Sequence, residues 1–306
     1  MKIGIPRALL YHSYKDLWLS FFENLGIQTI ISPPTNKDII RKGNFNTIDE
    51  ACYSSKIYIG HVEYLLDKCD YIFVPRIENT GIKEEFCTRL FGIYDLVVNT
   101  FPNAKLLHAN INYNFRKTEK DAFIAIGESL GKTQEESKRA YIEALEKFEE
   151  IKFKTIDKQL ELLKSANMKV LIVSHIYNTF DSAIGESVLK FFKDNKIEVI
   201  FADIVNFKEA KQKAKEKYSR IYWRPSIELV GGLELYKDNV DGIVLLSTFP
   251  CMPDSIVNEL IIRTTKDKPI LSLMFDELDA TAGLMTRLES FMDILTSKRA
   301  GINYGN

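Results

Sequence analysis

The stretch from Met168 to Ile204 reads MKVLIVSHIYNTFDSAIGESVLKFFKDNKIEVIFADI, and it indicates the fold class of the chain. It begins with an apolar run, continues with an amphipathic segment that reaches Phe192, and ends with a second apolar run. Apolar runs that alternate with helical patterns are typical of strand-helix-strand units, whose strands lie parallel in one sheet. We therefore expect a parallel α/β fold.

The same alternation occurs earlier in the chain. A short apolar run, KIGI, leads to a helical pattern that ends at Gly26, and a further helix is expected from about Asp49 to Asp67. Three more apolar runs read as strands, namely IQTIIS, YIFVPRI (Tyr71 to Ile77) and AKLLHANI (Ala104 to Ile111). The N-terminal part therefore contains its own set of alternating strands and helices.

The remaining sequence completes a two-lobed plan. Residues 117–164 are helical in pattern and strongly charged. Two later strands are expected at VDGIVLLSTFPC (Val240 to Cys251) and KPILSLMFDE (Lys268 to Glu277). We expect an α/β protein of two Rossmann-like lobes with parallel sheets, residues 1–115 and 167–306, joined by a helical segment over residues 116–166. Each lobe opens with a strand-helix-strand unit, which is compatible with a distant internal duplication.

The sequence GKT at Gly131 to Thr133 invites comparison with phosphate-binding loops, in which backbone amides and a lysine surround phosphate groups. The nearest upstream glycine, Gly127, is one position too close for that motif, and no strand precedes it. We instead expect one helix to end at Gly131 and another to begin at Thr133, with Glu136 completing a capping box. Because no other glycine-rich phosphate loop is present, we do not expect this chain to bind ATP.

The composition is that of an ordinary globular protein. The 306 residues are 45% hydrophobic and 27% charged, with a formal net charge of −1, so no global field attracts nucleic acid or an anionic membrane. No stretch approaches the roughly 18 apolar residues of a membrane-spanning helix, and the first residues lack the apolar run of a signal peptide. We therefore expect a cytoplasmic protein without nucleic-acid or membrane partners.

Four cysteines are candidates for chemistry: Cys52, Cys69, Cys87 and Cys251. A cytoplasmic protein of this size needs no disulfide framework, so the thiols serve packing, catalysis or metal binding. Their spacing matches no zinc-finger or ferredoxin pattern. In open parallel sheets, ligands bind outside the carboxyl ends of strands, and Cys251 and Cys87 lie in loops that follow expected strands. Their position therefore favours function, while their spacing leaves the role open.

The stretch DEACYSSKIYIGH, Asp49 to His61, offers Cys52 and His61 as a nucleophile and a base. Nine residues apart in one helix, the two side chains would be separated by about 13 Å along the axis. They therefore cannot hydrogen-bond. A nucleophilic Cys52 would need His108 or His175 as its base.

Several motifs resemble one known family. IGIPRALLYHSYKDLWLSFFENLG, DEACYSSKIYIGHVEYLL and YIFVPRI resemble the opening of the 2-hydroxyacyl-CoA dehydratase superfamily, which includes benzoyl-CoA reductase and 2-hydroxyglutaryl-CoA dehydratase subunits. EEFCTRLFGIYDLV, STFPCMPDSIVNELI and LSLMFDELDATAGLMTRLESFMDIL resemble segments of its small acyl-CoA dehydratase activase-related members. The motifs occur in the right order in both lobes, so the resemblance covers most of the chain.

The resemblance implies an oxygen-sensitive 4Fe–4S cluster between the two lobes, held by three cysteines and reduced by an ATP-hydrolysing activator protein. Position by position, the ligands would be Cys52, Cys87 and Cys251, whereas Cys69 matches no ligand position and is interpreted as a packed residue. The sequence departs from its relatives at Tyr53 and Thr88, where they often have Leu or Pro, and in FPCMPD, where glycines are common around the cysteine. These departures concern neighbours of the ligands and bear on the potential of the cluster.

The same resemblance implies electron transfer in anaerobic chemistry. It leaves the reaction open between an (R)-2-hydroxyacyl-CoA dehydratase-like lyase and an ATP-dependent reductase, and the assembly open between a homodimer and a heterodimer with a related subunit. A different class of function is a non-catalytic metal-binding or maturation partner of a dehydratase-like enzyme, with structural zinc or no metal.

Other polar residues are weaker candidates. Arg7 and Arg76 lie at the ends of expected strands, where a guanidinium could bind an acyl, carboxylate or phosphate group of a substrate, or form an ion pair. His175 and Glu277 are the candidate catalytic groups, and Glu277 would require burial that raises its pKa. Asp254, which follows Cys251, is expected to cap the next helix.

Overall fold

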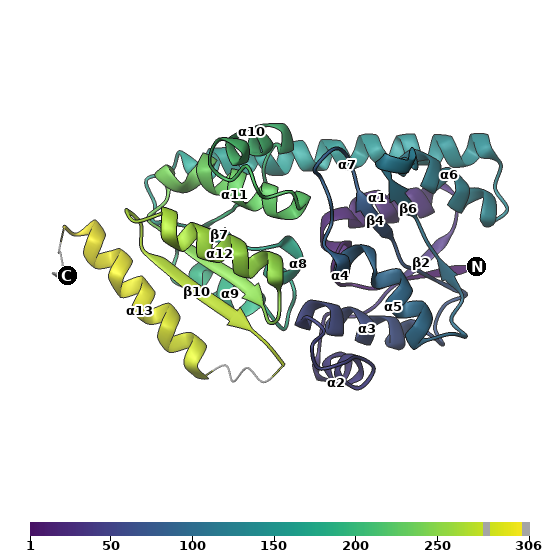
Figure 1. Ribbon diagram of the computed structural model, residues 1–306, viewed down its shortest axis with the longest axis horizontal. Coiled ribbons are helices and arrows are strands. Elements are labelled where there is room, and N and C mark those ends of the chain that lie inside the picture. The colour runs from purple at the N-terminus through teal and green to yellow at the C-terminus, as the bar shows by residue number, and fades with distance from the viewer. Residues whose placement is uncertain (278–281, 302–306) are drawn as a thin grey trace. The chain divides into compact units, whose positions relative to one another are not determined.

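The computed structural model describes residues 1–277 and 282–301, and within them the chain forms two compact units (Figure 1). Unit 1 comprises Met1–Lys154 with Tyr222–Arg224, and unit 2 comprises Thr155–Ile221 with Pro225–Asn306. The division between the units falls inside one long helix, α7 (Gln134–Leu163), which lies within the expected helical segment 116–166. Parallel strands alternate with helices in both units, so the expected α/β class with Rossmann-like lobes is confirmed.

The central sheet of unit 1 has four parallel strands in the order β2-β1-β3-β5. A second sheet pairs β4 with β6, also in parallel. The strands are β1 (Lys2–Ile5), β2 (Gln28–Ile31), β3 (Tyr71–Phe73), β4 (Arg76–Asn79), β5 (Leu106–Leu107) and β6 (Asn110–Asn112). The single strands expected over 71–77 and 104–111 are thus each divided in two. Pro75 lies at the first division and has no amide hydrogen to donate to the sheet.

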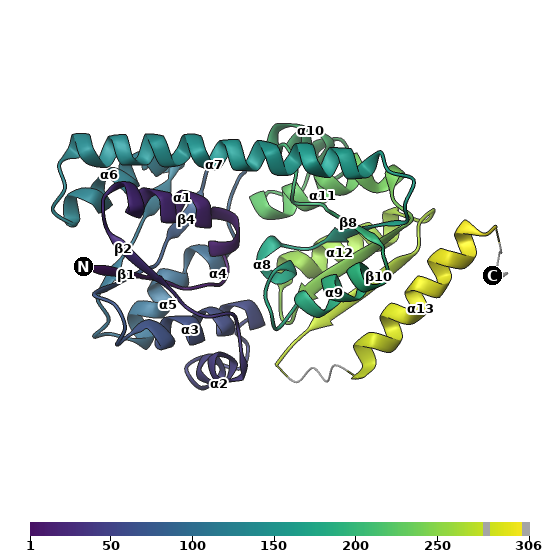
Figure 2. The ribbon, with the colours of Figure 1, turned by 180° about the vertical axis from the view of Figure 1, so that it is seen from behind.

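Aromatic side chains join the helices of unit 1 to its sheet. The ring centroids of Trp18 and Phe22 lie 5.0 and 5.6 Å from that of Phe73, and Phe21 lies 4.8 Å from Phe123. Helices α1, α6 and α7 therefore cover one face, and α3 and α5 lie on the other (Figures 1 and 2). The helices are α1 (Tyr11–Asn24), α2 (Lys37–Phe45), α3 (Tyr53–Leu65), α4 (Thr88–Phe91), α5 (Ile93–Thr100), the 3-10 turn Tyr113–Phe115, α6 (Glu119–Ser129) and α7.

Two expected helix ends in unit 1 are confirmed. Gly26 follows Leu25, the C-cap residue of α1, and adopts a φ of +69°, a conformation that costs glycine little. At the start of α7, the Glu136 amide donates to Thr133 Oγ1 at 3.2 Å, and the Thr133 amide donates to Glu136 Oε2 at 2.8 Å. This is the capping box expected in place of a phosphate loop. The helix expected from about Asp49 begins instead at Tyr53.

Unit 2 has one sheet of four parallel strands in the order β10-β9-β7-β8. Alternate residues of β7 and β9 face a core formed with α10, α11 and α12, which includes Leu171, Ile243 and Leu245. The elements are β7 (Lys169–Val173), α8 (Ile176–Thr179), α9 (Glu186–Asp194), β8 (Glu198–Phe201), α10 (Phe207–Lys217), α11 (Arg224–Tyr236), the 3-10 turn Lys237–Asn239, β9 (Gly242–Thr248), α12 (Met252–Thr264), β10 (Ile270–Phe275) and α13 (Ala282–Arg299).

The two sheets share one topology. When the four strands of each sheet are counted from the first, both follow the order 2-1-3-4 and are parallel throughout. In such sheets the chain crosses to the other side of the first strand after the second, and ligands bind at the carboxyl ends of the first and third strands. These ends are β1 and β3 in unit 1, and β7 and β9 in unit 2.

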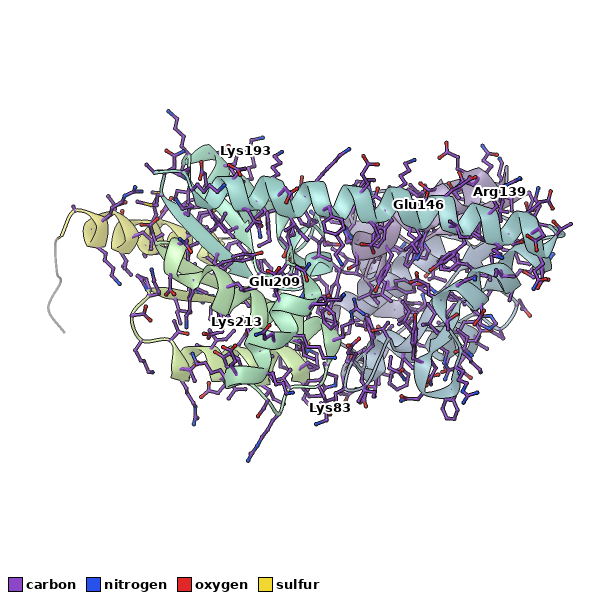
Figure 3. All side chains as sticks on the ribbon, turned by 90° about the horizontal axis from the view of Figure 1, so that it is seen from above. Lys83, Arg139, Glu146, Lys193, Glu209 and Lys213 are labelled. Atoms are coloured by element: carbon purple, nitrogen blue, oxygen red, sulfur yellow. The ribbon has the colours of Figure 1, made fainter. Side chains whose placement is uncertain are left out.

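Charged side chains of both signs are interspersed on the surface. Exposed residues such as Arg139 and Glu146 on α7, and Lys193 and Glu209 in unit 2, extend outward (Figure 3). Among the described residues, no helix is both long enough and apolar enough to cross a membrane. The surface therefore agrees with the near-zero net charge.

Helices α2 and α3 approach each other at two glycines. A Cβ added at Gly60 would lie 2.0 Å from the backbone oxygen of Ile39, and one added at Gly43 would lie 2.0 Å from that of Lys56. We expect Gly60→Ala to lower the free energy of unfolding by about 1–3 kcal/mol, because the backbones must separate. Guanidinium unfolding followed by fluorescence measures this, since Trp18 and Trp223 both belong to unit 1.

Gly283→Ala is the matched control. It also adds one methyl group to a helix, but nothing lies within 4 Å of the added Cβ, and Gly283 is exposed. It should leave stability unchanged or raise it by up to about 1 kcal/mol. Equal effects of the two substitutions would contradict the close approach of α2 and α3.

Candidate functional site

Each of the three implicated cysteines is the residue directly before a helix. Cys52 precedes α3, Cys87 precedes α4 and Cys251 precedes α12, and all three have extended backbones. None of them caps its helix through a side-chain hydrogen bond. The first amides of a helix have no partner within the helix and carry partial positive charge, so anions are favoured beside them. The three cysteines therefore share one position relative to a helix start, although their burial differs.

Cys69 has a different environment. Its thiol donates to the backbone oxygen of Leu65 at 3.2 Å, and it packs so closely on β1 that a Cβ added at Gly4 would lie 2.5 Å from Sγ. Burial raises the pKa of the Cys69 thiol above its usual value. A neutral thiol that fills space beside a glycine is a packing residue, as the sequence interpretation expected.

The loops that carry Cys52 and Cys87 lie side by side in unit 1. Arg89, two residues after Cys87, donates from Nη2 to the backbone oxygen of Glu50 at 3.4 Å, two residues before Cys52. Cys52 is buried, with Sγ 3.0 Å from Ser55 Oγ, and Cys87 is partly exposed. Cys251 belongs to unit 2, in the loop after β9, where the Phe249–Pro250 peptide bond is cis.

The donor set fits an iron–sulfur cluster in its chemistry, because all three thiols are free of disulfides. No group of three or more His, Cys, Asp or Glu side chains in the described ranges is arranged to hold a metal ion. Two of the implicated thiols belong to unit 1 and one to unit 2, so neither unit by itself contains the set.

His61 takes no part in a dyad with Cys52. Its ring is fully buried, with Nδ1 2.8 Å from Ser32 Oγ and Nε2 3.0 Å from Thr35 Oγ1. Burial, together with the nearby His12 and Arg7, lowers the pKa of His61 to about 3. The exclusion of the dyad by helix geometry is thus confirmed. Thr35 lies close to α2 but contacts His61, and the side chain of Asn36 caps that helix.

His108, one of the two histidines considered as a base for Cys52, makes its ring contact elsewhere. Its ring lies against Tyr94, with ring centroids 4.6 Å apart, and burial lowers its pKa. Among the contacts in the described ranges, Cys52 Sγ approaches the hydroxyl of Ser55 rather than an imidazole.

His175 and Asp254 form a buried pair in unit 2. His175 follows β7 and Asp254 lies in the first turn of α12, after β9, and His175 Nε2 lies 2.8 Å from Asp254 Oδ1. Both residues are almost fully buried. Burial alone would lower the pKa of His175, but the attraction and hydrogen bond of Asp254 outweigh it, so the pKa is raised. The expectation that Asp254 caps α12 is wrong, because its carboxylate binds a histidine from another strand end.

Two further acids surround this pair, and sequence reasoning did not select them. Asp203, after β8, has its pKa raised to about 7 by burial and by the charge of Glu228 on α11. Both carboxylates also raise the pKa of His175. Asp203 stands directly after an apolar strand, IEVIFA, so its position at the carboxyl end of the sheet was a signal available in the sequence.

The two arginine candidates differ in their partners. Arg76, in β4, lies with Nε 3.4 Å from Glu78 Oε1 and Nη1 3.2 Å from Asp95 Oδ1, so it forms ion pairs. Arg7 follows β1, and its backbone amide donates to Ser32 Oγ at 2.8 Å. Neither an ion pair nor a hydrogen bond of the Arg7 guanidinium is present within the described ranges.

Glu277 lies two residues after β10 and is exposed, so it lacks the burial that a role in proton transfer would require. Residues 278–281, which follow it in the motif FDELDATAG, lie outside the described residues. Further along, the Arg287 guanidinium donates to the backbone oxygen of Ser272 in β10, which anchors α13 to the sheet.

The buried pair predicts that Asp254→Asn lowers the stability of the protein by an amount that depends on pH. The folded pKa of His175 is raised, so its charge stabilises the protein fully below the unfolded pKa of about 6.5, and this contribution is lost as pH rises through the folded value. We expect Asp254→Asn to lower the free energy of unfolding by about 2–4 kcal/mol near pH 6, and by less near pH 9. Denaturant unfolding at both pH values measures the difference.

The control is Asp194→Asn in the same unit. Asp194 Oδ2 pairs with Lys190 Nζ at 2.6 Å, but both side chains are exposed. Exposed ion pairs contribute little to stability, so Asp194→Asn should change the free energy of unfolding by no more than about 0.5 kcal/mol at either pH. A loss in Asp254→Asn that did not shrink at high pH would show that His175 carries no charge in the folded protein.

Comparisons with solved structures give no close match. The SBP FpvC of Pseudomonas aeruginosa in complex with Mn²⁺ is 11% identical, with a TM-score of 0.31, and the match covers 98% of this chain and 99% of that one. A Zn(II)-bound AdcAII variant of Streptococcus pneumoniae is 12% identical, with a TM-score of 0.31, over 97% and 98% of the two chains. Likenesses at this level carry no argument about the fold or the function.

No curated protein matches the sequence. One family model does, over residues 2–205, which include all of the unit 1 sheet, α7, β7 and β8, together with Cys52, Cys87 and His175. Its description is "CoA enzyme activase uncharacterised domain", and the family is related to the acyl-CoA dehydratase activases. The match spans about two thirds of the sequence, and the chain therefore belongs to the CoA enzyme activase uncharacterised domain family.

Proposed function

We propose that this protein is an iron–sulfur redox protein of the 2-hydroxyacyl-CoA dehydratase type, in which Cys52, Cys87 and Cys251 hold a 4Fe–4S cluster. The observation that carries the proposal is the common position of these three cysteines, each outside any disulfide and directly before a helix. Cys69, which the sequence resemblance sets apart, has a different position and a different environment.

The local structure supports negative charge at these three positions. No side chain of the cysteines caps α3, α4 or α12, and each cysteine directly precedes the start of its helix, where the aligned amides favour negative charge. When bound, such a cluster supplies one-electron transfer, and three protein ligands leave one iron open to a small molecule. The chain itself contributes the thiolates and the positive ends of the helices.

The electron source in this proposal is a separate ATP-hydrolysing activator protein. The chain belongs to a family related to acyl-CoA dehydratase activases, and its GKT sequence forms a capping box rather than a nucleotide-binding loop. ATP hydrolysis is therefore assigned to the partner. The reaction served would be reductive or radical chemistry on an acyl-CoA, either as a lyase or as a reductase.

His175 is the proposed proton donor of this chemistry. Asp254 raises its pKa and fixes its Nε2 by a 2.8 Å contact, so the imidazolium form persists to higher pH than for a free histidine. The pair lies at the carboxyl ends of β7 and β9, and its Asp254 belongs to the helix α12 that directly follows Cys251. The helix that Cys251 precedes therefore also carries the carboxylate that holds the proposed proton donor.

Purification without oxygen tests the cluster. We expect about four iron atoms and about four sulfides per chain, together with a broad absorption near about 400 nm. These values are the signature of a 4Fe–4S cluster. Cys52→Ala, Cys87→Ala and Cys251→Ala should each lose the iron and the absorption, because each removes a ligand. Cys69→Ala is the matched control, which removes a thiol outside the set and should retain the iron.

The outcomes separate the proposal from its alternative. Stoichiometric zinc without sulfide would favour an accessory protein with a structural metal site, since three thiolates also suit zinc. A Cys251→Ala protein that keeps its full iron content would exclude Cys251 as a ligand. Circular dichroism of each variant confirms that loss of iron does not reflect unfolding.

A further inference from the structure

The loop between β1 and α1 contains Arg7, a cation for which the described residues supply no counter-ion. Arg7 is partly buried, and no carboxylate within the described ranges pairs with its guanidinium. It nevertheless acts on its surroundings, because its charge contributes to lowering the pKa of both His12 and His61. A partly buried charge that is not paired costs free energy unless a ligand or water compensates it.

His12, in the first turn of α1, presents a buried acceptor beside this cation. Burial and the charge of Arg7 lower its pKa to about 4, so the ring is neutral at pH 7, and it hydrogen-bonds to the backbone of Arg7. That bond favours the protonated ring and therefore uses one nitrogen as a donor. The other nitrogen, Nε2, is buried and has no partner in the part of the chain that the structure describes. A neutral Nε2 accepts a hydrogen bond.

Three successive amides complete the loop. Ala8, Leu9 and Leu10 are buried, and no hydrogen bond from their amides is present within the described ranges. They lead into the 14-residue helix α1, whose N-cap residue, Leu10, makes no side-chain cap. Buried amides are rarely left unpaired. The N-terminus of a helix as long as α1 also favours an anion. These amides add to the site that Arg7 and His12 define.

We propose that the loop of residues 7–12 binds a phosphate group, with the Arg7 guanidinium, His12 Nε2 and the amides of residues 8–10 as its contacts. The site is separate from the cysteines and does not depend on the proposed cluster.

The pattern of donors and acceptors favours phosphate over a carboxylate. Both anions would pair with Arg7 and the amides, but an ionised carboxylate only accepts hydrogen bonds and would leave His12 Nε2 unpaired. A phosphate or phosphate monoester has its second pKa near 6, so near neutral pH it still carries a proton in part of the population. That proton can be donated to His12 Nε2. The ligand class is therefore inorganic phosphate or a small phosphate monoester.

Proton NMR of the histidine rings of the full-length protein tests this, because the chain has only four histidines. Inorganic phosphate, added at constant ionic strength and pH 7, should produce a saturable shift of one imidazole signal. His12→Asn identifies that signal by its loss. Acetate at the same ionic strength should leave the signal in place. The same titration is repeated with glycerol phosphate. If glycerol phosphate binds more tightly than inorganic phosphate, the ligand is a monoester; if it binds equally or more weakly, the ligand is the free ion.

Two arginine variants separate binding from folding. Arg7→Gln should weaken phosphate binding on the order of 10- to 100-fold, since a charge-assisted contact is lost. Arg41→Gln is the matched control, because Arg41 is exposed and already binds Asp38 Oδ1 at 2.8 Å; its affinity should equal that of the unmodified protein. Should Arg7→Gln unfold, as judged by circular dichroism, Arg7→Lys keeps the charge and should bind with intermediate affinity.

Three results would overturn the proposal. The first is the absence of a saturable shift of the His12 signal with either phosphate compound. The second is unchanged affinity in a folded Arg7→Gln or Arg7→Lys protein. The third is acetate binding to the same signal as tightly as phosphate, which would make the loop a carboxylate site.

Discussion

The parallel direction of every strand in the two four-stranded sheets is the constraint on which the rest of the structure depends. Parallel strands end at one edge of a sheet, so loops from distant parts of the sequence meet there. In unit 1 this edge brings Ser32, after β2, to the amide of Arg7, after β1. In unit 2 it brings His175, after β7, to Asp254, after β9. Neither contact follows from proximity along the chain.

The same topology presents opposite charge in the two units. At the edge of unit 1, Arg7 lies among His12 and His61, whose pKa values are lowered so far that both rings are neutral at pH 7. At the edge of unit 2, a histidine of raised pKa lies among Asp203, Glu228 and Asp254. The pKa of the same residue type is thus raised in one unit and lowered in the other, because the neighbouring charges differ in sign. The edge of the unit 1 sheet therefore favours an anion, whereas the edge of the unit 2 sheet favours a protonated group.

Features set by neighbouring residues could be predicted from the sequence. Apolar runs gave the strands, Gly26 ended α1, and Thr133 with Glu136 capped α7, because each depends on a few consecutive residues. Pro75 also acts locally, yet the apolar character of 71–77 concealed the division of that strand. Asp254 looked like a cap from its position near a helix start, and only the paired strand ends show that it binds His175.

The candidate site shows the same limit. The resemblance separated Cys69 from the other three cysteines, and the structure gives them different surroundings, but whether the trio binds a cluster is a question of metal content. His12 escaped selection because nothing in its sequence neighbourhood shows that one ring nitrogen is bound to the Arg7 backbone while the other is buried alone. The role of a histidine depends on both nitrogens, and therefore on contacts that a sequence does not display.

Within unit 1, helix α3 connects the proposed phosphate loop to the proposed cluster ligand. Cys52 stands directly before α3, and His61, on the same helix, holds Ser32, which in turn accepts the hydrogen bond of the Arg7 amide. Gly60 keeps α3 in backbone contact with α2, so the helix cannot shift without breaking buried contacts. A single well-packed helix therefore sets the position of the thiol at its start and of the anion-binding loop beside its middle. The two sites are distinct in chemistry, but their geometry depends on the same element.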